Sequence, residues 1–190
     1  MLGRGIIMSE QQSLQTYEVN PVHNELVKID ISWSTIRLYG IGYCEHSFVQ
    51  EPRLVCPVNN EQGYLLGYFG VNHKLAIEYS RTIKRSNVLF GVDKLNSINT
   101  QKNQLVIVHN PLDVLYCHTW GLSAISTLQN VPSKQQARNI SSLVDGCGYK
   151  KVRYLYSEQQ TPAEIGKIQE ILMRRHRIWM SPLAEFRDSI

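Results

Sequence analysis

The chain has 190 residues, with 20 Lys and Arg against 16 Asp and Glu, so its formal net charge is +4 and its pI is about 8.9. This weak positive charge permits a nucleic-acid partner without requiring one. No apolar run is long enough to cross a bilayer and the four cysteines form no Cys-x-x-Cys pair, so we expect a cytoplasmic protein with reduced thiols and no structural zinc site.

The distribution of polar and apolar residues predicts three segments. Residues 1–20 are polar and rich in Gln, without a sustained period, which is typical of a flexible N-terminal segment. The polar linker 94–103 is the candidate boundary between two folded units. We therefore expect a small mixed unit over residues 21–100 and a second unit over residues 101–190.

The first folded unit is expected to combine a short helix with a hairpin. Ser32 can cap a helix that carries Trp33 and Ile36 on its apolar face. Between Arg53 and Phe69, the apolar runs RLVCPV and YLLGYFG flank the turn-forming residues NNEQG. Two apolar strands around a polar turn predict an antiparallel pair.

The stretch 104–121, QLVIVHNPLDVLYCHTWG, is the most informative part of the sequence. Its apolar run 105–108 predicts a strand buried in a parallel sheet. Asn110 can cap the helix that follows, Pro111 suits the first helical position, and Asp113 falls near the positive end of the helix dipole. Because α/β proteins bind ligands where strands end and helices begin, this junction is a candidate functional site.

After this junction, strand and helix patterns alternate. Strand candidates occupy residues 123–128, 151–156 and 178–180, and capping boxes mark helices that begin after Ser133 and after Thr161. Such alternation is typical of βαβ units, so we expect an α/β fold with a parallel sheet flanked by helices.

The order of these features resembles the catalytic core of bacterial DnaG-type primases, in which a small N-terminal subdomain precedes a Toprim domain. The similar N-terminal features are Gly42-Tyr43 after a helix, the hairpin RLVCPVNNEQGYLLGYFG and the block KRSNVLFGVDK. The stretch VIVHNPLDVLYCHTWGLSAIST is similar to the opening of the Toprim domain. The resemblance implies a Toprim-like parallel sheet flanked by helices, preceded by a primase-type mixed (α+β) subdomain.

The residues also depart from the family pattern where that family holds magnesium. The resemblance places His109 at the position of a glutamate, and Ser157 and Gln159 at the positions of an Asp-x-Asp pair, whereas Asp113 survives. Magnesium prefers carboxylate oxygens, which imidazole, hydroxyl and amide groups do not replace. We therefore interpret these four residues as a vestigial catalytic site, and we expect neither bound Mg²⁺ nor another cofactor.

Positively charged residues are retained in the N-terminal unit. The resemblance implies that Arg53, Lys84 and Arg85 lie where the family contacts nucleic acid or nucleotide, and Lys74 and Arg81 add to the positive charge nearby. A solvated surface is the alternative explanation for such a run.

Three hypotheses about function remain open. The first is a primase-like protein without metal-dependent nucleotidyl transfer, which acts in DNA replication or its control for a phage, plasmid or other mobile element. It would bind single-stranded DNA or an RNA–DNA hybrid, a replisome protein such as a helicase or primase, or both. The second is an active nucleotidyltransferase or nuclease that uses His109, His118 and Asp113 as acid, base or ligands of a softer metal. The third is an interaction protein that acts as a decoy of a primase.

Overall fold

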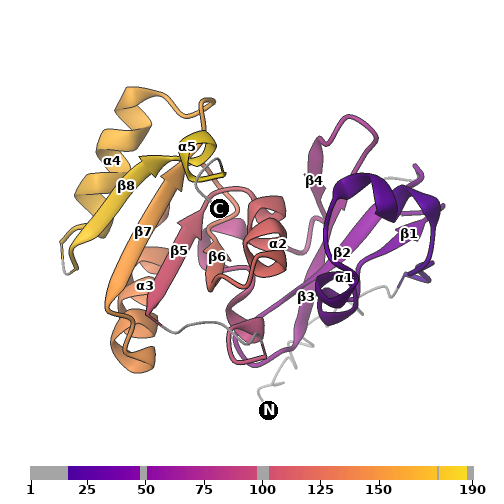
Figure 1. The fold of residues 1–190 in the computed structure, drawn as a ribbon, viewed down its shortest axis with the longest axis horizontal. Helices are drawn as coiled ribbons and strands as arrows, with labels where there is room; N and C mark the ends of the chain where they lie inside the picture. Colours follow the sequence, from indigo (N-terminus) through magenta and orange to yellow (C-terminus); the bar gives the residue numbers. More distant parts are fainter. Residues whose placement is uncertain (1–16, 48–50, 98–102, 175, 188–190) are drawn as a thin grey trace, which may run out of the picture.

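The computed structural model describes residues 17–47, 51–97, 103–174 and 176–187. Most of the predicted N-terminal segment 1–20 lies outside the described residues. Residues 17–20 are described, and the backbone of Asn20 forms a β-bridge with Tyr43. The described residues form two four-stranded sheets, which lie on opposite sides of one helix (Pro111–Thr119), labelled α2 in Figure 1.

The N-terminal sheet is antiparallel, with the strand order β1-β2-β3-β4. The strands cover β1 (Gly42–Cys44), β2 (Arg53–Asn59), β3 (Leu65–Val71) and β4 (Ile77–Tyr79). The predicted hairpin is confirmed as β2 and β3. Strands β1 and β4, each three residues long, were not predicted from the sequence.

The helices of this unit are short: a 3₁₀ helix η1 (Asn24–Ile29) precedes α1 (Trp33–Tyr39). Ser32 caps α1 as predicted, because its Oγ accepts a hydrogen bond of 3.2 Å from the Thr35 backbone N–H. Gly40, with φ of +65°, ends α1 in the left-handed conformation that glycine adopts without strain.

The C-terminal sheet is parallel, with the strand order β6-β5-β7-β8, and it confirms the predicted α/β fold. Its strands cover β5 (Gln104–Val108), β6 (Ala124–Ser126), β7 (Lys151–Tyr156) and β8 (Ile178–Pro182). Its helices cover α2 (Pro111–Thr119), α3 (Lys134–Cys147), α4 (Pro162–Leu172) and α5 (Leu183–Arg187). The short helix α5 had no counterpart in the sequence analysis.

The side chains of β5 alternate between two hydrophobic clusters, one on each face of the sheet. Leu105 and Ile107 pack with buried residues of α3 and α4. Val106 and Val108 pack with α2 and with the buried face of the N-terminal sheet. Helix α2 therefore belongs to a core that the two sheets share, and α3 and α4 cover the opposite face.

Both predicted capping boxes are present. The Ser133 side chain accepts from the Gln136 backbone N–H at the start of α3, and the Thr161 side chain accepts from the Glu164 backbone N–H at the start of α4. In each case the side chain of the third helical residue accepts from the cap backbone in return.

The segment between β4 and β5 ties the two sheets together. Its described residues include two single-turn 3₁₀ helices, η2 (Arg85–Asn87) and η3 (Val92–Lys94), and Phe90 forms a β-bridge with Ser126 of β6. The side-chain nitrogen of buried Gln136 lies within hydrogen-bond distance of the carbonyl oxygens of Arg85, Val88 and Thr127, at 2.8, 2.7 and 2.6 Å. Part of the linker 94–103 lies outside the described residues, so the domain limits stay a prediction.

None of the helices in the described part of the chain is long and apolar enough to span a membrane. The four cysteines are free thiols, and three of them are buried.

Candidate functional site

The carboxyl ends of β5 and β7 define the candidate site. The two strands are parallel neighbours, with Ile107 opposite Tyr154. His109 follows β5 by one residue and Ser157 follows β7 by one residue. Because the strands run in the same direction, both residues lie at the same edge of the sheet, where α/β proteins bind ligands.

His109 is partly buried, and its Nδ1 atom forms no hydrogen bond within the described residues. Desolvation by burial lowers the pKa of its imidazole below the usual 6.5, although the negative charge of Glu164 opposes this shift. The imidazole is therefore neutral at neutral pH. The backbone around it is fixed, because the Ser126 hydroxyl donates a hydrogen bond of 2.7 Å to the His109 carbonyl oxygen.

Ser157 and Gln159 have different surroundings after β7. The Oγ atom of Ser157 is buried and makes no hydrogen bond within the described residues, whereas Gln159 is exposed. The loop closes through Gln160, whose Oε1 accepts from the Ser157 backbone N–H at 3.1 Å. Gln160 also donates to the Asn130 carbonyl oxygen at 2.6 Å and to the Tyr154 hydroxyl at 3.1 Å.

Gln160 is the residue of this edge that the sequence analysis missed. Only 5% of its surface is exposed, which is unusual for glutamine. Its position four residues after the end of a strand is the only signal in the sequence that could have indicated a loop-closing role.

Asp113 lies in the first turn of α2 and is buried. The helix begins as predicted, with the Asn110 side chain accepting a hydrogen bond of 2.8 Å from the Leu112 backbone N–H. Asp113 is therefore a carboxylate at the positive end of the helix dipole, and its place in a vestigial site stays a prediction.

The residues at this edge do not fit a magnesium site. Among the described residues, no group of three or more His, Cys, Asp and Glu side chains is placed to hold a metal ion. At the positions where the family holds magnesium, the side chains are a neutral imidazole, a hydroxyl and an amide; Glu158, between the last two, is exposed, and Asn110 already uses its side-chain oxygen as a helix cap. Magnesium requires several oxygen ligands, chiefly carboxylates, so no metal-dependent step can be derived from these residues.

His118 has a structural environment within the shared core. It lies at the opposite end of α2 from Asp113 and is 6% exposed. Its Nδ1 is 2.8 Å from the Tyr39 hydroxyl, and its Nε2 is 3.0 Å from the Ala124 carbonyl oxygen. Burial lowers the pKa of this imidazole to about 4. These contacts assign His118 to packing, together with buried Cys117.

The candidate nucleic-acid-binding residues Lys74, Arg81, Lys84 and Arg85 are exposed and flank the edge strand β4. Lys74 lies in the turn before β4, and the other three follow the strand. The guanidinium of Arg85 stacks over the Tyr79 ring, 5.0 Å from its centroid. The structure thus places all four at one edge of the N-terminal sheet, in two groups.

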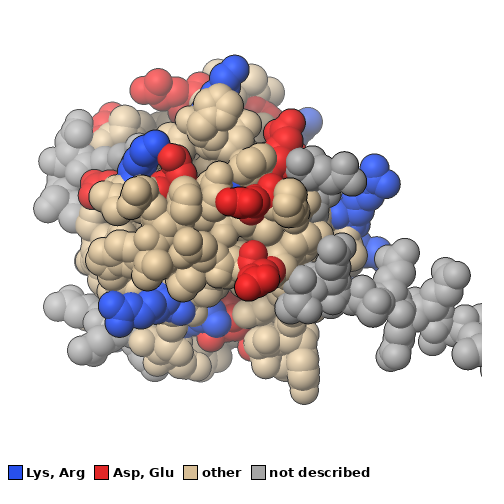
Figure 2. Space-filling model, turned by 90° about the vertical axis from the view of Figure 1, so that its right-hand side faces the viewer, with Lys and Arg blue, Asp and Glu red and all other residues tan. Residues whose placement is uncertain are grey.

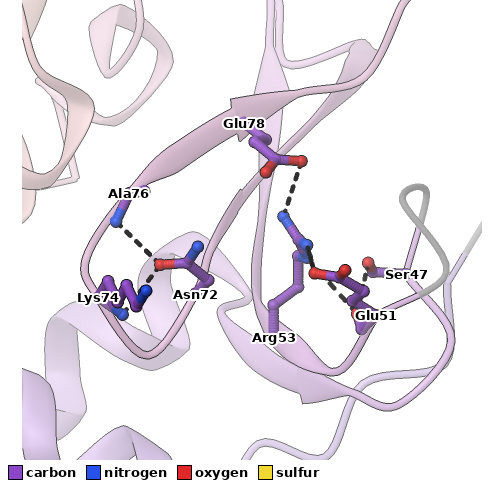
Figure 3. Close-up of polar contacts among 7 residues, drawn as sticks. All are labelled: Ser47, Glu51, Arg53, Asn72, Lys74, Ala76 and Glu78. Atoms are coloured by element: carbon purple, nitrogen blue, oxygen red, sulfur yellow. Dashed lines mark hydrogen bonds and ion pairs between the residues drawn. The ribbon is translucent and has the colours of Figure 1, made fainter.

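Arg53 has a different environment from the other candidates (Figure 3). Its side chain is 1% exposed and lies between two carboxylates, with ion pairs of 3.0 Å to Glu51 and 3.1 Å to Glu78. The Ser47 hydroxyl donates to the Glu51 carbonyl oxygen and so helps to hold that segment. A phosphate would have to compete with both carboxylates for Arg53, whose role in nucleic-acid binding stays a prediction.

Figure 2 views the end of the molecule that the N-terminal sheet forms. Uncharged residues cover most of the described surface there, and Lys and Arg side chains lie toward its margins among Asp and Glu. This end therefore gives no support for a broad phosphate-binding face among the residues that the structure describes.

No family model matches this sequence, and no curated protein sequence matches it. Solved structures do match. A DnaG catalytic core matches with a TM-score of 0.67 and 14% identity, covering 83% of this chain and 64% of that chain. A DnaG primase catalytic domain bound to single-stranded DNA matches with a TM-score of 0.65 and 14% identity, covering 91% and 67%. The primase fragment of the bacteriophage T7 primase-helicase protein matches with a TM-score of 0.60 and 12% identity, covering 80% and 62%.

The fold is thus that of a primase catalytic core, with an antiparallel N-terminal sheet followed by a parallel four-stranded sheet and its helices. The particular match is to the core of DnaG, over most of this chain and at low sequence identity. This confirms the resemblance at the level of the fold. The chain spans 64% of the length of the DnaG catalytic core that it matches, so the activity and partners of such proteins do not transfer to it directly.

Proposed function

We propose that this chain is a primase-like protein that binds nucleic acid in DNA replication or its control and does not carry out metal-dependent nucleotidyl transfer. A phage, plasmid or other mobile element is the setting that we favour, and we place the protein in the cytoplasm. The observation that carries the proposal is the chemistry at the ends of β5 and β7. His109 and Ser157 occupy these positions, and neither supplies the carboxylate that magnesium requires.

Nucleic-acid binding is supported by the exposed cations around β4. Within the described residues, Lys74, Arg81 and Lys84 form no ion pair with a carboxylate. Their charge is available to phosphate groups, and Arg85 on Tyr79 adds a planar cation beside an aromatic ring. We infer single-stranded DNA or an RNA–DNA hybrid as the ligand, with weak affinity.

The binding test measures the affinity for a labelled single-stranded oligonucleotide by fluorescence anisotropy at several salt concentrations. Each phosphate contact that is lost should reduce the slope of log affinity against log salt by about 0.7. Arg81→Ala combined with Lys84→Ala should therefore reduce this slope by about 1.4 and weaken binding to all sequences alike. Lys150→Ala, an exposed lysine after α3, serves as the matched control. Affinity that does not change with salt would refute the proposal.

The catalytic half of the proposal is tested by primer synthesis and by oligonucleotide cleavage with magnesium, manganese or zinc. We expect neither a primer nor a cleavage product with any of the three metal ions. One observation favours the competing hypothesis of an active enzyme: the buried Nδ1 atom of His109 has no hydrogen-bond partner among the described residues, so it keeps its capacity to accept a proton. Product formation that disappears in His109→Ala would establish that alternative and exclude ours.

A further inference from the structure

Helices α3 and α4 cover the face of the C-terminal sheet opposite α2 (Figure 1). A groove runs between these two helices. Its volume is about 440 Å³, and it reaches the first residue of β8. The buried residues Ile140, Leu172 and Ile178 line it, together with the partly buried Ala137 and Ile171. The groove therefore offers an aliphatic floor to any molecule that enters it.

The walls of the groove are positively charged. Lys134 and Arg138 lie four residues apart on α3, Lys167 lies on α4, and Arg174 lies in the turn that follows α4. Glu170 is the carboxylate among the lining residues, and it already forms an ion pair of 3.0 Å with Arg174. The other three cations form no ion pair within the described residues.

A polar contact fixes the part of the groove that Ser141 and His176 line. The Ser141 hydroxyl lies 2.8 Å from Nε2 of His176, and this nitrogen is 3.8 Å from a carboxylate oxygen of Asp145. The contact joins α3 to the segment between α4 and β8, so the spacing of the two walls is held by the fold.

We propose that this α3–α4 groove docks an acidic amphipathic helix of a partner protein. An apolar floor between two rows of cations complements a helix whose aliphatic stripe is bordered by Asp and Glu. The described lining contains no Phe, Tyr or Trp, and its one aromatic ring, that of His176, is held by Ser141, whereas sites for single-stranded nucleic acid stack successive bases on aromatic side chains. A small inorganic anion would leave the aliphatic floor unused.

This site is independent of the proposed nucleic-acid contacts. It uses none of the residues at the ends of β5 and β7 and none of the cations around β4. Two pairs of charge reversals can therefore separate the two proposals. Arg138→Glu with Lys167→Glu alters the groove, and Arg81→Glu with Lys84→Glu alters the edge of the N-terminal sheet.

The probe is a synthetic peptide of about 18 residues, with Leu at helical spacing i, i+3, i+4 and i+7 and Glu at the flanking positions. One control peptide carries Lys in place of Glu, and a second carries a central Pro that breaks the helix. Binding to the full chain is measured by calorimetry. Amide chemical shifts show whether Ala137 and Ile171 lie at the contact, and circular dichroism verifies that each variant is folded.

We expect saturable binding of the acidic peptide and weaker binding of both control peptides. The groove variant should lose at least about tenfold in affinity, and the β4-edge variant should bind the peptide as the wild type does. Equal affinity of the groove variant and the wild type, or no saturable binding, would overturn the proposal. Loss of oligonucleotide affinity in the groove variant with unchanged peptide binding would also overturn it and would assign the groove to nucleic acid. If the protein binds the peptide but not oligonucleotides, the docking proposal is supported and only the proposed nucleic-acid function is refuted.

Discussion

At the scale of single residues, His109 and His118 show how burial sets the protonation state of an imidazole. Both imidazoles have a lowered pKa because desolvation disfavours the charged form. His118 has hydrogen-bonding partners for its ring in the core, whereas Nδ1 of His109 has none within the described residues. The first is therefore a packing residue, and the second holds a buried polar atom without a hydrogen-bond partner in the described part of the chain.

The His118 environment predicts a loss of stability in mild acid. In the unfolded chain this imidazole binds a proton below about pH 6.5, and in the folded chain it does so only below about pH 4. Between these values the unfolded state binds more protons, so the free energy of unfolding falls as the pH falls. Lowering the pH from 7 to 5 should cost about 2 kcal/mol.

Urea unfolding at both pH values measures this effect, with His118→Gln as the comparison because glutamine does not titrate. The variant should be less stable than the wild type at pH 7 and should lose much less stability on acidification. An equal pH dependence in the two proteins would show that other groups cause it.

At the scale of elements, strand β3 depends on a close approach of the chain that follows β4. A Cβ atom added at Gly67 would lie 2.5 Å from Oγ1 of Thr82 and 2.8 Å from Cγ1 of Ile83, and it would also clash with Oγ of Ser80. The Tyr68 backbone exchanges hydrogen bonds with Ser80, so the crossing segment is held against the strand. Gly67 is required by this packing.

Gly67→Ala is expected to lower the free energy of unfolding by about 2 kcal/mol, because overpacking forces the neighbouring backbone to move. Gly166 lies inside α4 with open space around it, and Gly166→Ala should raise the stability by up to about 1 kcal/mol through helix propensity. Denaturant midpoints of the two variants measure both effects. A change of the same sign in both would contradict the steric argument.

At the scale of the whole molecule, one hydrophobic cluster contains residues of both sheets. Leu54 and Phe69 of the N-terminal sheet share it with Val106 and Val108 of the C-terminal sheet. The Phe90 bridge and the Gln136 side chain add polar connections between the same parts of the chain. We therefore expect the described parts of the chain to unfold together.

Gln136→Leu should lower the free energy of unfolding by about 3 kcal/mol, because buried carbonyl groups lose their donor. Gln135→Ala is the control, since Gln135 is exposed, and it should change stability by less than about 0.5 kcal/mol. Single-tryptophan variants that keep Trp33 on α1 or Trp179 on β8 report on the two sheets. Their unfolding curves should coincide in the presence and absence of Gln136→Leu. Two separate transitions would show that the sheets unfold independently.

Local sequence patterns were sufficient to predict much of the fold. The apolar run before His109, the cap at Asn110 and the capping boxes at Ser133 and Thr161 depend on near neighbours in the chain, and each is present. Strands β1 and β4 escaped prediction because each is only three residues long and lies at an edge of its sheet, paired with a single neighbouring strand. The vestigial site and the retained cations were predicted from the resemblance, and their functional roles stay predictions.

The sequence by itself determined the chemical types at the ends of β5 and β7, because residue identity decides which groups can hold a metal ion. The tertiary structure decided how each group is used. Burial between Glu51 and Glu78 engages the charge of Arg53, and contact with Tyr39 makes His118 a core residue. Only folding brings α3 and α4 together into a groove with charged walls, because its lining residues come from segments far apart in the chain.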